Sequence, residues 1–319
     1  MRILITGARG FIGLSVASAL IEQGADLILC DNGSRGPADT AFESLLSNPS
    51  VTYFDVDLTK STGWDILPKG IDAIFHFAAI NGTRYFYERP YEVINTNLLC
   101  TIEMLHWHLK NDSNSHIIWT SSSETYASVN HPIPTSENTS VGISDVFNPR
   151  YSYAASKLAG EVLLINYART ENKPFTIVRP HNIYGPRMGT EHVIPEFIMR
   201  LINKENPFLI YGAEQTRCFC YIDDFVNGML ATLAHEEAKG QIFHLGDDRN
   251  EIKIIDLAQM LHDIANTETN FKVEPAPAGS VERRKPDITK AKDLLGFRPV
   301  MDLRLGLKST LDWYSEETL

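Results

Sequence analysis

The sequence predicts an α/β protein, a doubly wound parallel sheet followed by a smaller mixed α/β lobe. Up to about residue 180, short apolar runs alternate with helix-sized segments, the pattern of a parallel sheet covered on both faces. The first run passes directly into a glycine-rich loop, which is typical of the turn from strand to helix in such folds. Beyond about Tyr184 the apolar runs shorten and turn residues multiply, so a second unit is expected there.

Six apolar runs are interpreted as buried strands. They cover residues 2–6, 26–31, 51–57, 72–79, 116–123 and 175–185. Helices are predicted between most of them from the spacing of apolar side chains, notably over 11–24, 91–109 and 151–169. In the C-terminal part, helices are expected from Asp224 to about His235 and over 254–264.

Composition narrows the classes of partner. Of the 319 residues, 43% are hydrophobic and 22% are charged, which is ordinary for a soluble globular protein. The formal net charge of -11 argues against nucleic acid or an anionic membrane as a main partner, because both favour clustered Lys and Arg. The four cysteines are too few for a disulfide framework, and Cys218-x-Cys220 is too tight for the usual zinc pair, so no metal is expected. No basic leader and no run of about 20 apolar residues is present, so a cytoplasmic location is predicted.

Three glycines, Gly7, Gly10 and Gly13, follow the first predicted strand in the segment TGARGFIG. In this setting the first permits the turn, and the second lets backbone amides approach a pyrophosphate at the positive end of the helix. The third lets helix and strand pack closely. A plain tight turn is the alternative, but strand, turn and helix together favour a dinucleotide-binding loop.

Asp31, at the end of the second predicted strand, indicates which dinucleotide binds. A carboxylate there hydrogen-bonds both hydroxyls of an adenosine ribose and repels a 2′-phosphate, so NAD is favoured over NADP. The nearby Arg35 opposes this preference slightly. Asp57, after the third strand, is placed to face the adenine edge. For both aspartates a strand-end cap is the alternative interpretation.

Tyr153 and Lys157 lie four residues apart in YSYAASK and therefore share one face of a predicted helix. The segment SSSETY (121–126) ends the fifth predicted strand, at the carboxyl edge of the sheet where open α/β folds bind ligands. A solvated surface pair is the alternative for the tyrosine and the lysine. Their place beside the glycine loop and the serines favours a catalytic pair.

Together these motifs resemble the extended short-chain dehydrogenase/reductase family, whose members act on sugars linked to nucleoside diphosphates. The resemblance covers most of the chain. It also rests on Ala78 and Ala79 after the fourth strand, on Asn97, and on the segments RPHNIYGPRM (179–188), QTRCFCYIDD (215–224) and RRKPDITKAKDLLGFRP (283–299). It implies a Rossmann NAD-binding domain over 1–180, receiving segments from about 217–245, and a nucleotide-sugar-binding lobe over 181–319. It also implies a homodimer in which the helices over 91–109 and 151–169 form a four-helix bundle.

The resemblance assigns roles to individual residues. In the family the tyrosine removes the proton of a sugar hydroxyl, and the lysine favours the phenolate and holds the nicotinamide ribose. We carry these roles onto Tyr153 and Lys157, because a free tyrosine, with a pKa near 10, needs a neighbouring cation to act as a base at neutral pH. Ser122 is the matching serine that hydrogen-bonds the reacting oxygen, with a strand-end cap as its alternative. The cofactor-binding candidates are Gly7, Gly10, Phe11, Ile12, Gly13, Asp31, Asn32, Asp57, Leu58, Ala78, Ala79, Asn97, Tyr153 and Lys157.

Ser123 and Glu124 bear on the type of reaction. Dehydratases of the family carry an Asp-Glu pair at these positions, whereas a Ser-Glu pair resembles the nucleotide-sugar decarboxylases. The segments QTR (215–217) and RKPDI (284–288) favour decarboxylation too, but YAASK is closer to epimerases and dehydratases. The loop NGTRYFYERP (81–90) is expected to line the sugar pocket, and it matches none of these groups.

The leading prediction is an NAD-dependent nucleotide-sugar epimerase or dehydratase that works through a transient 4-keto sugar. A decarboxylase of the UDP-glucuronate type, or a simple C4 dehydrogenase, is the alternative, and a non-enzymatic NAD-sensing protein is a remote one. Asn182, Arg217 and Arg284 are the candidates for gripping the diphosphate and the sugar, because amide and guanidinium groups suit such oxygens. A plain surface position is the alternative for each of these three.

Overall fold

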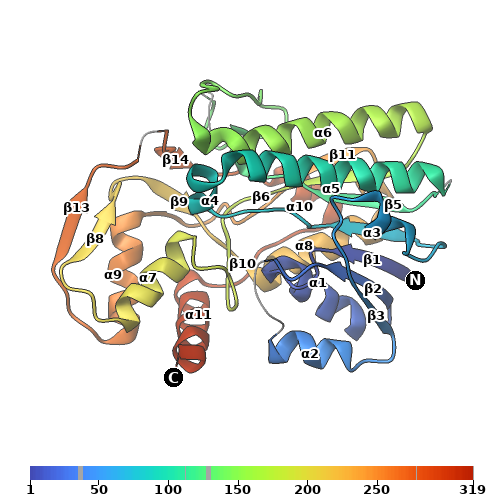
Figure 1. Ribbon diagram of the computed structural model, residues 1–319. Helices are drawn as coiled ribbons and strands as arrows, with labels where there is room; N and C mark the ends of the chain where they lie inside the picture. The colour runs from blue at the N-terminus through green and yellow to red at the C-terminus, as the bar shows by residue number, and fades with distance from the viewer. Residues whose placement is uncertain (35–38, 112, 127–130, 278, 319) are drawn as a thin grey trace.

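The computed structural model describes residues 1–34, 39–111, 113–126, 131–277 and 279–318. Its centre is a seven-stranded sheet in the order β11-β6-β5-β4-β1-β2-β3, with every neighbouring pair parallel (Figure 1). The strands are β1 (Arg2–Thr6), β2 (Asp26–Asp31), β3 (Val51–Asp55), β4 (Ala73–His76), β5 (His116–Thr120), β6 (Phe175–Pro180) and β11 (Gln241–Leu245). The predicted doubly wound α/β fold is confirmed.

The strand order reverses beside β1. The chain runs outward from β1 through β2 to β3, and then crosses back to place β4 on the other side of β1. In open parallel sheets this reversal leaves a crevice at the carboxyl ends of the strands, where ligands bind. The loops after β1, β4 and β5 meet at that crevice.

Helices cover both faces of the sheet (Figure 1). One face packs against α1 (Phe11–Glu22) and α8 (Ile222–Ala234), which contribute Val16, Leu20, Phe225 and Met229 to the larger core. α2 (Thr40–Leu46) extends that core beside β3. The smaller core, on the opposite face, is built around α3 (Ser61–Asp65), α5 (Pro90–Lys110) and α6 (Ser152–Glu171).

A smaller lobe lies beyond the carboxyl edge of the sheet, with α7, α9 and α11 stacked beside β8 and β13 (Figure 1). The helices of the lobe are α7 (Val193–Ile202), α9 (Ile254–Ala265) and α11 (Leu303–Thr318). Two short helices lie against the sheet domain: α4 (Thr83–Glu88) beside α5, and α10 (Thr289–Leu295) against α8 and β11. The strands of the lobe pair as β7 (Ile183–Tyr184) with β10 (Cys220–Tyr221), β8 (Phe208–Tyr211) with β13 (Phe271–Glu274), and β9 (Thr216–Cys218) with both β12 (Glu251–Lys253) and β14 (Arg283–Arg284).

The predicted strand over 175–185 is two strands in the structure. β6 ends at Pro180, and Asn182 adopts φ +46, which turns the chain before β7 pairs with β10. The fifth strand likewise ends at Thr120, and Ser123–Tyr126 form a 3₁₀ turn instead of its last residues. Ile183 and Tyr184 continue the apolar pattern past Pro180, and the serines after Thr120 include no glycine or proline to mark a turn, so the sequence pattern alone did not locate these turns.

Candidate active site

The glycine loop and the loop after β4 touch each other. Gly7 has φ +70, and a Cβ built on it would lie 2.8 Å from the backbone N of Ala78. A Cβ on Gly13 would lie 2.2 Å from the carbonyl oxygen of Gly7. Gly10 is the N-cap of α1 and supplies no side-chain hydrogen bond to it. The positive end of α1 is therefore free of a side-chain cap, which fits a pyrophosphate at this loop.

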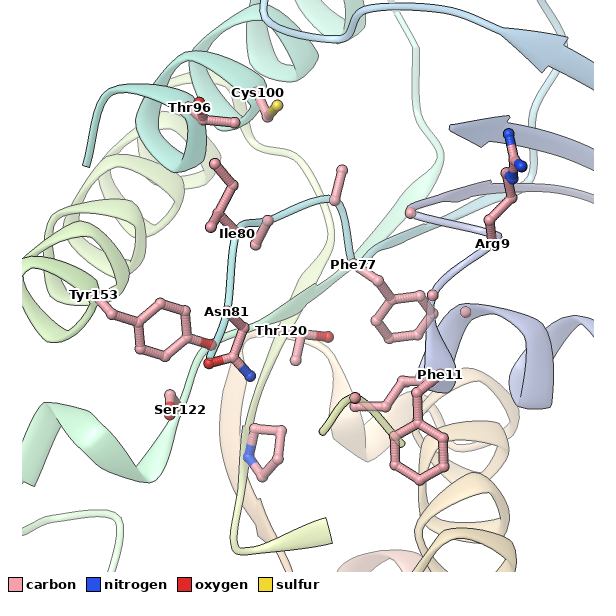
Figure 2. A pocket seen from close by; sticks show the side chains of 18 of the residues that line it. Arg9, Phe11, Phe77, Ile80, Asn81, Thr96, Cys100, Thr120, Ser122 and Tyr153 are labelled. Atoms are coloured by element: carbon pink, nitrogen blue, oxygen red, sulfur yellow. The ribbon is translucent and has the colours of Figure 1, made fainter. Parts of the chain in front are cut away.

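A cavity of about 550 Å³ opens at the carboxyl edge of the sheet. The residues predicted for the site that line it are Gly7, Gly10, Phe11, Ile12, Gly13, Asp31, Asn32, Asp57, Leu58, Ala78, Ala79, Ser122, Ser123, Glu124, Tyr153, Lys157, Asn182 and Arg284. Figure 2 shows Tyr153, Asn81 and Ser122 at one end of it and Arg9 at the other, with Phe11 and Phe77 between them. The cavity is thus elongated, as a dinucleotide requires.

Two predicted residues lie elsewhere. Asn97 is buried on α5 and does not line this cavity: its side-chain oxygen accepts the backbone N–H of Ile80 at 2.7 Å, and its amide nitrogen donates to Ser156 Oγ at 3.1 Å. Through these hydrogen bonds Asn97 fixes the loop after β4 without lining the cavity itself. Arg217 lines a second cavity, which is described below.

Asp31 ends β2 with its carboxylate at the cavity. Its oxygens accept the backbone N–H groups of Arg9 at 3.0 Å and Gly33 at 2.8 Å, so the carboxylate is held in one orientation. Asp57 accepts a hydrogen bond from the backbone N–H of Thr59 at 3.0 Å. Arg35 lies outside the described residues.

NADP is expected to bind at least about 100-fold more weakly than NAD, because its 2′-phosphate would meet the fixed carboxylate of Asp31. Isothermal titration of both dinucleotides measures the ratio. Asp31→Asn should bring the NAD and NADP dissociation constants closer together, whereas Asp57→Asn should leave their ratio nearly unchanged. Equal affinities for NAD and NADP in the unaltered protein would refute the role of Asp31.

Tyr153 and Lys157 lie in the first two turns of α6, whose entry is a 3₁₀ turn (Pro149–Tyr151). The Tyr153 ring stacks on Phe86 with the ring centroids 4.9 Å apart. Lys157 Nζ donates to the carbonyl of Thr120 at 2.7 Å and lies 4.7 Å from the centroid of the Trp119 ring. Burial lowers the pKa of Lys157 to about 8. The two side chains thus reach the cavity in fixed orientations.

Ser122, Ser123 and Glu124 follow β5 at the same end of the cavity. Ser122 Oγ accepts the backbone N–H of Glu124 at 3.1 Å, and the hydroxyl hydrogen remains to be donated. The carboxylate of Glu124 accepts from Arg284 Nη1 at 2.8 Å and forms an ion pair with Arg150 Nη2 at 3.6 Å. Burial alone would raise the pKa of Glu124, but Arg284 and Arg150 outweigh it and hold the pKa at about 2. Glu124 is therefore an anion at neutral pH.

A second cavity, of about 270 Å³, adjoins the first and is lined by Arg150, Arg217, Arg284, Glu124 and Asn182, among others. Arg217 donates to the carbonyl of Val281 at 2.7 Å, and Asn182 Nδ2 donates to that of Cys218 at 2.9 Å. Burial, followed by repulsion from Arg284, lowers the pKa of Arg217 to about 9. The guanidinium groups of Arg284, Arg150 and Arg217 all lower the pKa of Glu124, so positive charge exceeds negative charge around this carboxylate. Such a surplus suits an anionic ligand.

One known protein family matches most of this chain in sequence. A model of the NAD dependent epimerase/dehydratase family matches residues 3–246. The chain belongs to this family. The predicted membership of the extended short-chain dehydrogenase/reductases, the enzymatic character and the cofactor NAD are thereby confirmed.

Curated relatives of this family member extend over nearly the whole chain. The UDP-N-acetyl-alpha-D-glucosaminuronate decarboxylase of Bacillus cytotoxicus is 33% identical, over 99% of this chain and 98% of the relative. The UDP-glucuronic acid decarboxylase 1 of Arabidopsis thaliana is 30% identical, over 96% of this chain and 68% of the relative.

Solved structures of related enzymes share the fold. The UDP-glucuronic acid 4-epimerase from Bacillus cereus, in complex with UDP-glucuronic acid and NAD, has a TM-score of 0.89 with 27% identity, and 99% of this chain and 100% of that chain are covered. The dTDP-glucose 4,6-dehydratase from Streptomyces venezuelae, with NAD bound, also has a TM-score of 0.89, with 25% identity over 99% of this chain and 97% of that chain.

Several residues at the site were not among those predicted. Arg150 stands three residues before Tyr153 in NPRYSY, a spacing that puts it at the entry of the same helix. Arg187 lies inside the segment RPHNIYGPRM and lines the first cavity together with Asp39. Asn81 comes from the loop that was expected to line the sugar pocket, and it does line the cavity. No local pattern marks Asp39.

Within the ranges that the structure describes, no helix is both long enough and apolar enough to cross a bilayer. The same ranges contain no group of three or more His, Cys, Asp or Glu side chains arranged to hold a metal ion.

Proposed function

We propose that this enzyme decarboxylates a UDP-linked hexuronate by way of a C4 ketone. The observation that carries the proposal is Glu124 held between Arg284 and Arg150 at the end of the cavity that Tyr153 lines. A reaction at a neutral hexose needs no surplus of positive charge beyond that required by the diphosphate. Both curated relatives described above are named as decarboxylases of UDP-linked uronates, which supports the same choice.

The chemistry follows from the position of the carboxylate in the substrate. NAD, when bound, accepts a hydride from C4 of the sugar and returns it at the end of the cycle. Tyr153, as phenolate, takes the C4 hydroxyl proton while Ser122 donates a hydrogen bond to the same oxygen. The C4 ketone makes the substrate a β-keto acid, so the C5–C6 bond breaks with its electrons moving to the C4 oxygen. Carbon dioxide leaves, and C5 takes up a proton from water. C4 is then reduced, and Tyr153 returns its proton to the C4 oxygen.

We propose a separate role for each of the charged residues at the site. The ammonium of Lys157 lies 5.8 Å from the centroid of the Tyr153 ring and favours its phenolate. Arg284 and Arg150 orient the sugar carboxylate. Their two positive charges meet only one negative charge, that of Glu124, so one positive charge is left for a second carboxylate. Arg217 and Asn182 are assigned to the diphosphate. With a pKa of about 2, Glu124 donates no proton at neutral pH.

A 4-epimerase of a UDP-linked hexuronate is the second candidate. The observation in its favour is the likeness to the UDP-glucuronic acid 4-epimerase, which uses the same type of substrate and cofactor. Such an enzyme must keep the carboxylate while the C4 ketone exists. The two reactions therefore share the ketone and differ in the fate of the C5–C6 bond.

A product screen decides between these reactions. The purified protein is incubated with NAD and, in turn, UDP-glucuronate, UDP-N-acetylglucosaminuronate, UDP-glucose and dTDP-glucose, and the products are examined by mass spectrometry and NMR. Loss of carbon dioxide from either uronate supports the proposal. A uronate isomer of unchanged mass would favour epimerisation, loss of water would indicate a dehydratase, and loss of two hydrogens with NADH accumulating a dehydrogenase. Reaction with the neutral hexoses alone would refute the hexuronate assignment.

We also propose a homodimer formed through α5 and α6, which lie side by side along one face (Figure 1). Leu109 on α5 and Val162 and Leu163 on α6 expose apolar side chains, which supports this surface. Light scattering is expected to give the mass of a dimer at micromolar concentration, and Val162→Glu with Leu163→Glu should give a monomer. A monomer in the unaltered protein would contradict the proposal.

We also propose a cytoplasmic location. All four cysteines are buried and form no disulfide, as is usual in a reducing compartment.

A further inference from the structure

Arg187 adopts a backbone conformation that is rare for a residue with a side chain. Its φ is +68, in the left-handed region where the Cβ atom is crowded. Such conformations persist where the surrounding contacts enforce them, and they gather at ligand-binding segments. The residue lies just after β7, in the turn that leads to α7.

The contacts that hold Arg187 cross between separate parts of the chain. Its Nε forms a hydrogen-bonded ion pair with the carboxylate of Asp39, although the two residues are 148 positions apart. Its Nη1 donates to the carbonyl of Arg9, in the glycine loop, at 2.9 Å. Asp39 is in turn the N-cap of α2, where its other oxygen accepts the backbone N–H of Phe42 at 2.9 Å. One guanidinium thus joins the glycine loop, the start of α2 and the C-terminal lobe.

Arg9, Asp39 and Arg187 all line the large cavity, as do Asp31 and Asn32. Asp31 is hydrogen-bonded to the backbone of Arg9, so the ion pair lies near the end assigned to the adenosine and away from Tyr153 (Figure 2). The side chains of Arg187 and Asp39 are 16% and 36% exposed, so the pair is partly shielded from water. A shielded arginine–carboxylate pair is stronger than a fully exposed one.

We propose that Arg187 and Asp39 form a clasp that closes the adenosine end of the cavity and retains NAD between turnovers. A reaction that removes and returns the same hydride consumes no NAD, so release of the cofactor serves no purpose in the cycle. The strained backbone of Arg187 places the guanidinium where it bridges the two lobes. For NAD to leave, this ion pair opens first, and the pair therefore slows dissociation more than it changes the chemical step.

The test measures the dissociation of NAD rather than activity. Protein loaded with radiolabelled NAD is mixed with excess unlabelled NAD, and the label retained on the protein is followed over time. Asp39→Asn keeps the N-cap of α2 but removes the charge. Arg187→Asn removes the guanidinium and suits the left-handed backbone. Each variant is expected to release NAD roughly tenfold faster, and the double variant no faster than Arg187→Asn, because that substitution already removes the whole ion pair together with the hydrogen bond to Arg9.

A matched control separates the clasp from a general loss of stability. The Arg200–Glu205 ion pair has similar side-chain exposures, 15% and 39%, and Glu205 does not line the cavity. Glu205→Gln is expected to leave the NAD dissociation rate unchanged. The proposal is overturned if the clasp variants release NAD at the rate of the unaltered protein, if Glu205→Gln accelerates release equally, or if the effects of the two clasp variants multiply in the double variant.

Discussion

Tyr153→Phe is expected to lower kcat by about 10³-fold, the largest effect of any single substitution at the site. The change removes one hydroxyl and leaves the ring, so the stacking on Phe86 at 4.9 Å is kept. Without the phenolate no side chain takes the C4 hydroxyl proton, and the ketone on which every later step depends does not form. Single-turnover kinetics with the uronate accepted in the product screen measures the loss.

Two comparisons make this result specific. NAD binding to Tyr153→Phe should match that of the unaltered protein, because the glycine loop and Asp31 are untouched. Tyr151→Phe, two residues earlier in the same chain segment, is a matched control and should retain nearly full turnover. Turnover of Tyr153→Phe at more than a tenth of the normal rate would rule out the tyrosine as the base.

Glu124→Gln is expected to lower kcat by about 10²-fold without raising KM for a UDP-linked uronate. The substitution removes the anion that Arg284 and Arg150 contact at 2.8 and 3.6 Å. Those guanidinium groups then hold the substrate carboxylate more firmly in the ground state, where its charge is still present. Tighter ground-state binding opposes the step in which that charge leaves the carboxylate. Steady-state measurement of kcat and KM tests both parts.

Arg150→Gln is the counterpart of this substitution. It should raise KM for the uronate, because a ligand for the carboxylate is lost, while binding of UDP-glucose changes little. If KM rises equally for UDP-glucose, Arg150 contacts the nucleotide part of the substrate instead.

The pH dependence follows from the same ion pairs. Because the pKa of Glu124 is lowered to about 2, its anion persists as the pH falls through the usual range of a carboxyl group. No ionisation of Glu124 should then appear in kcat between about pH 4 and pH 8. Arg284→Gln removes the larger of the two stabilising charges and leaves the burial, so the pKa of Glu124 should rise and the activity of that variant should fall toward acidic pH. An unchanged acid limb in Arg284→Gln would contradict the assigned pairing.

Much of the predicted site lies in short segments whose conformation can be inferred from neighbouring residues alone. Gly7, Gly10 and Gly13 make a turn that follows directly from their order, and Tyr153 and Lys157 share a helix face because they are four residues apart. Strands that alternate with helices place their carboxyl ends on one edge, so the meeting of Asp31 and Ser122 at one cavity was predictable without coordinates.

The sequence by itself thus determined the fold class, through the alternation of strands and helices, and the cofactor, through the glycine loop and Asp31. The roles proposed for Tyr153 and Lys157 came from the resemblance to the family, because their spacing alone shows only that they share a helix face.

Only the tertiary structure decided which charges meet. Glu124 and Arg284 are 160 positions apart, Asp39 and Arg187 are 148 apart, and no periodicity relates them. Their contacts arise where the C-terminal lobe folds back onto the carboxyl edge of the sheet. The ionisation of Glu124 and the clasp at the adenosine end both follow from that packing. In each case a carboxylate is partly or fully buried against an arginine that is distant in the sequence.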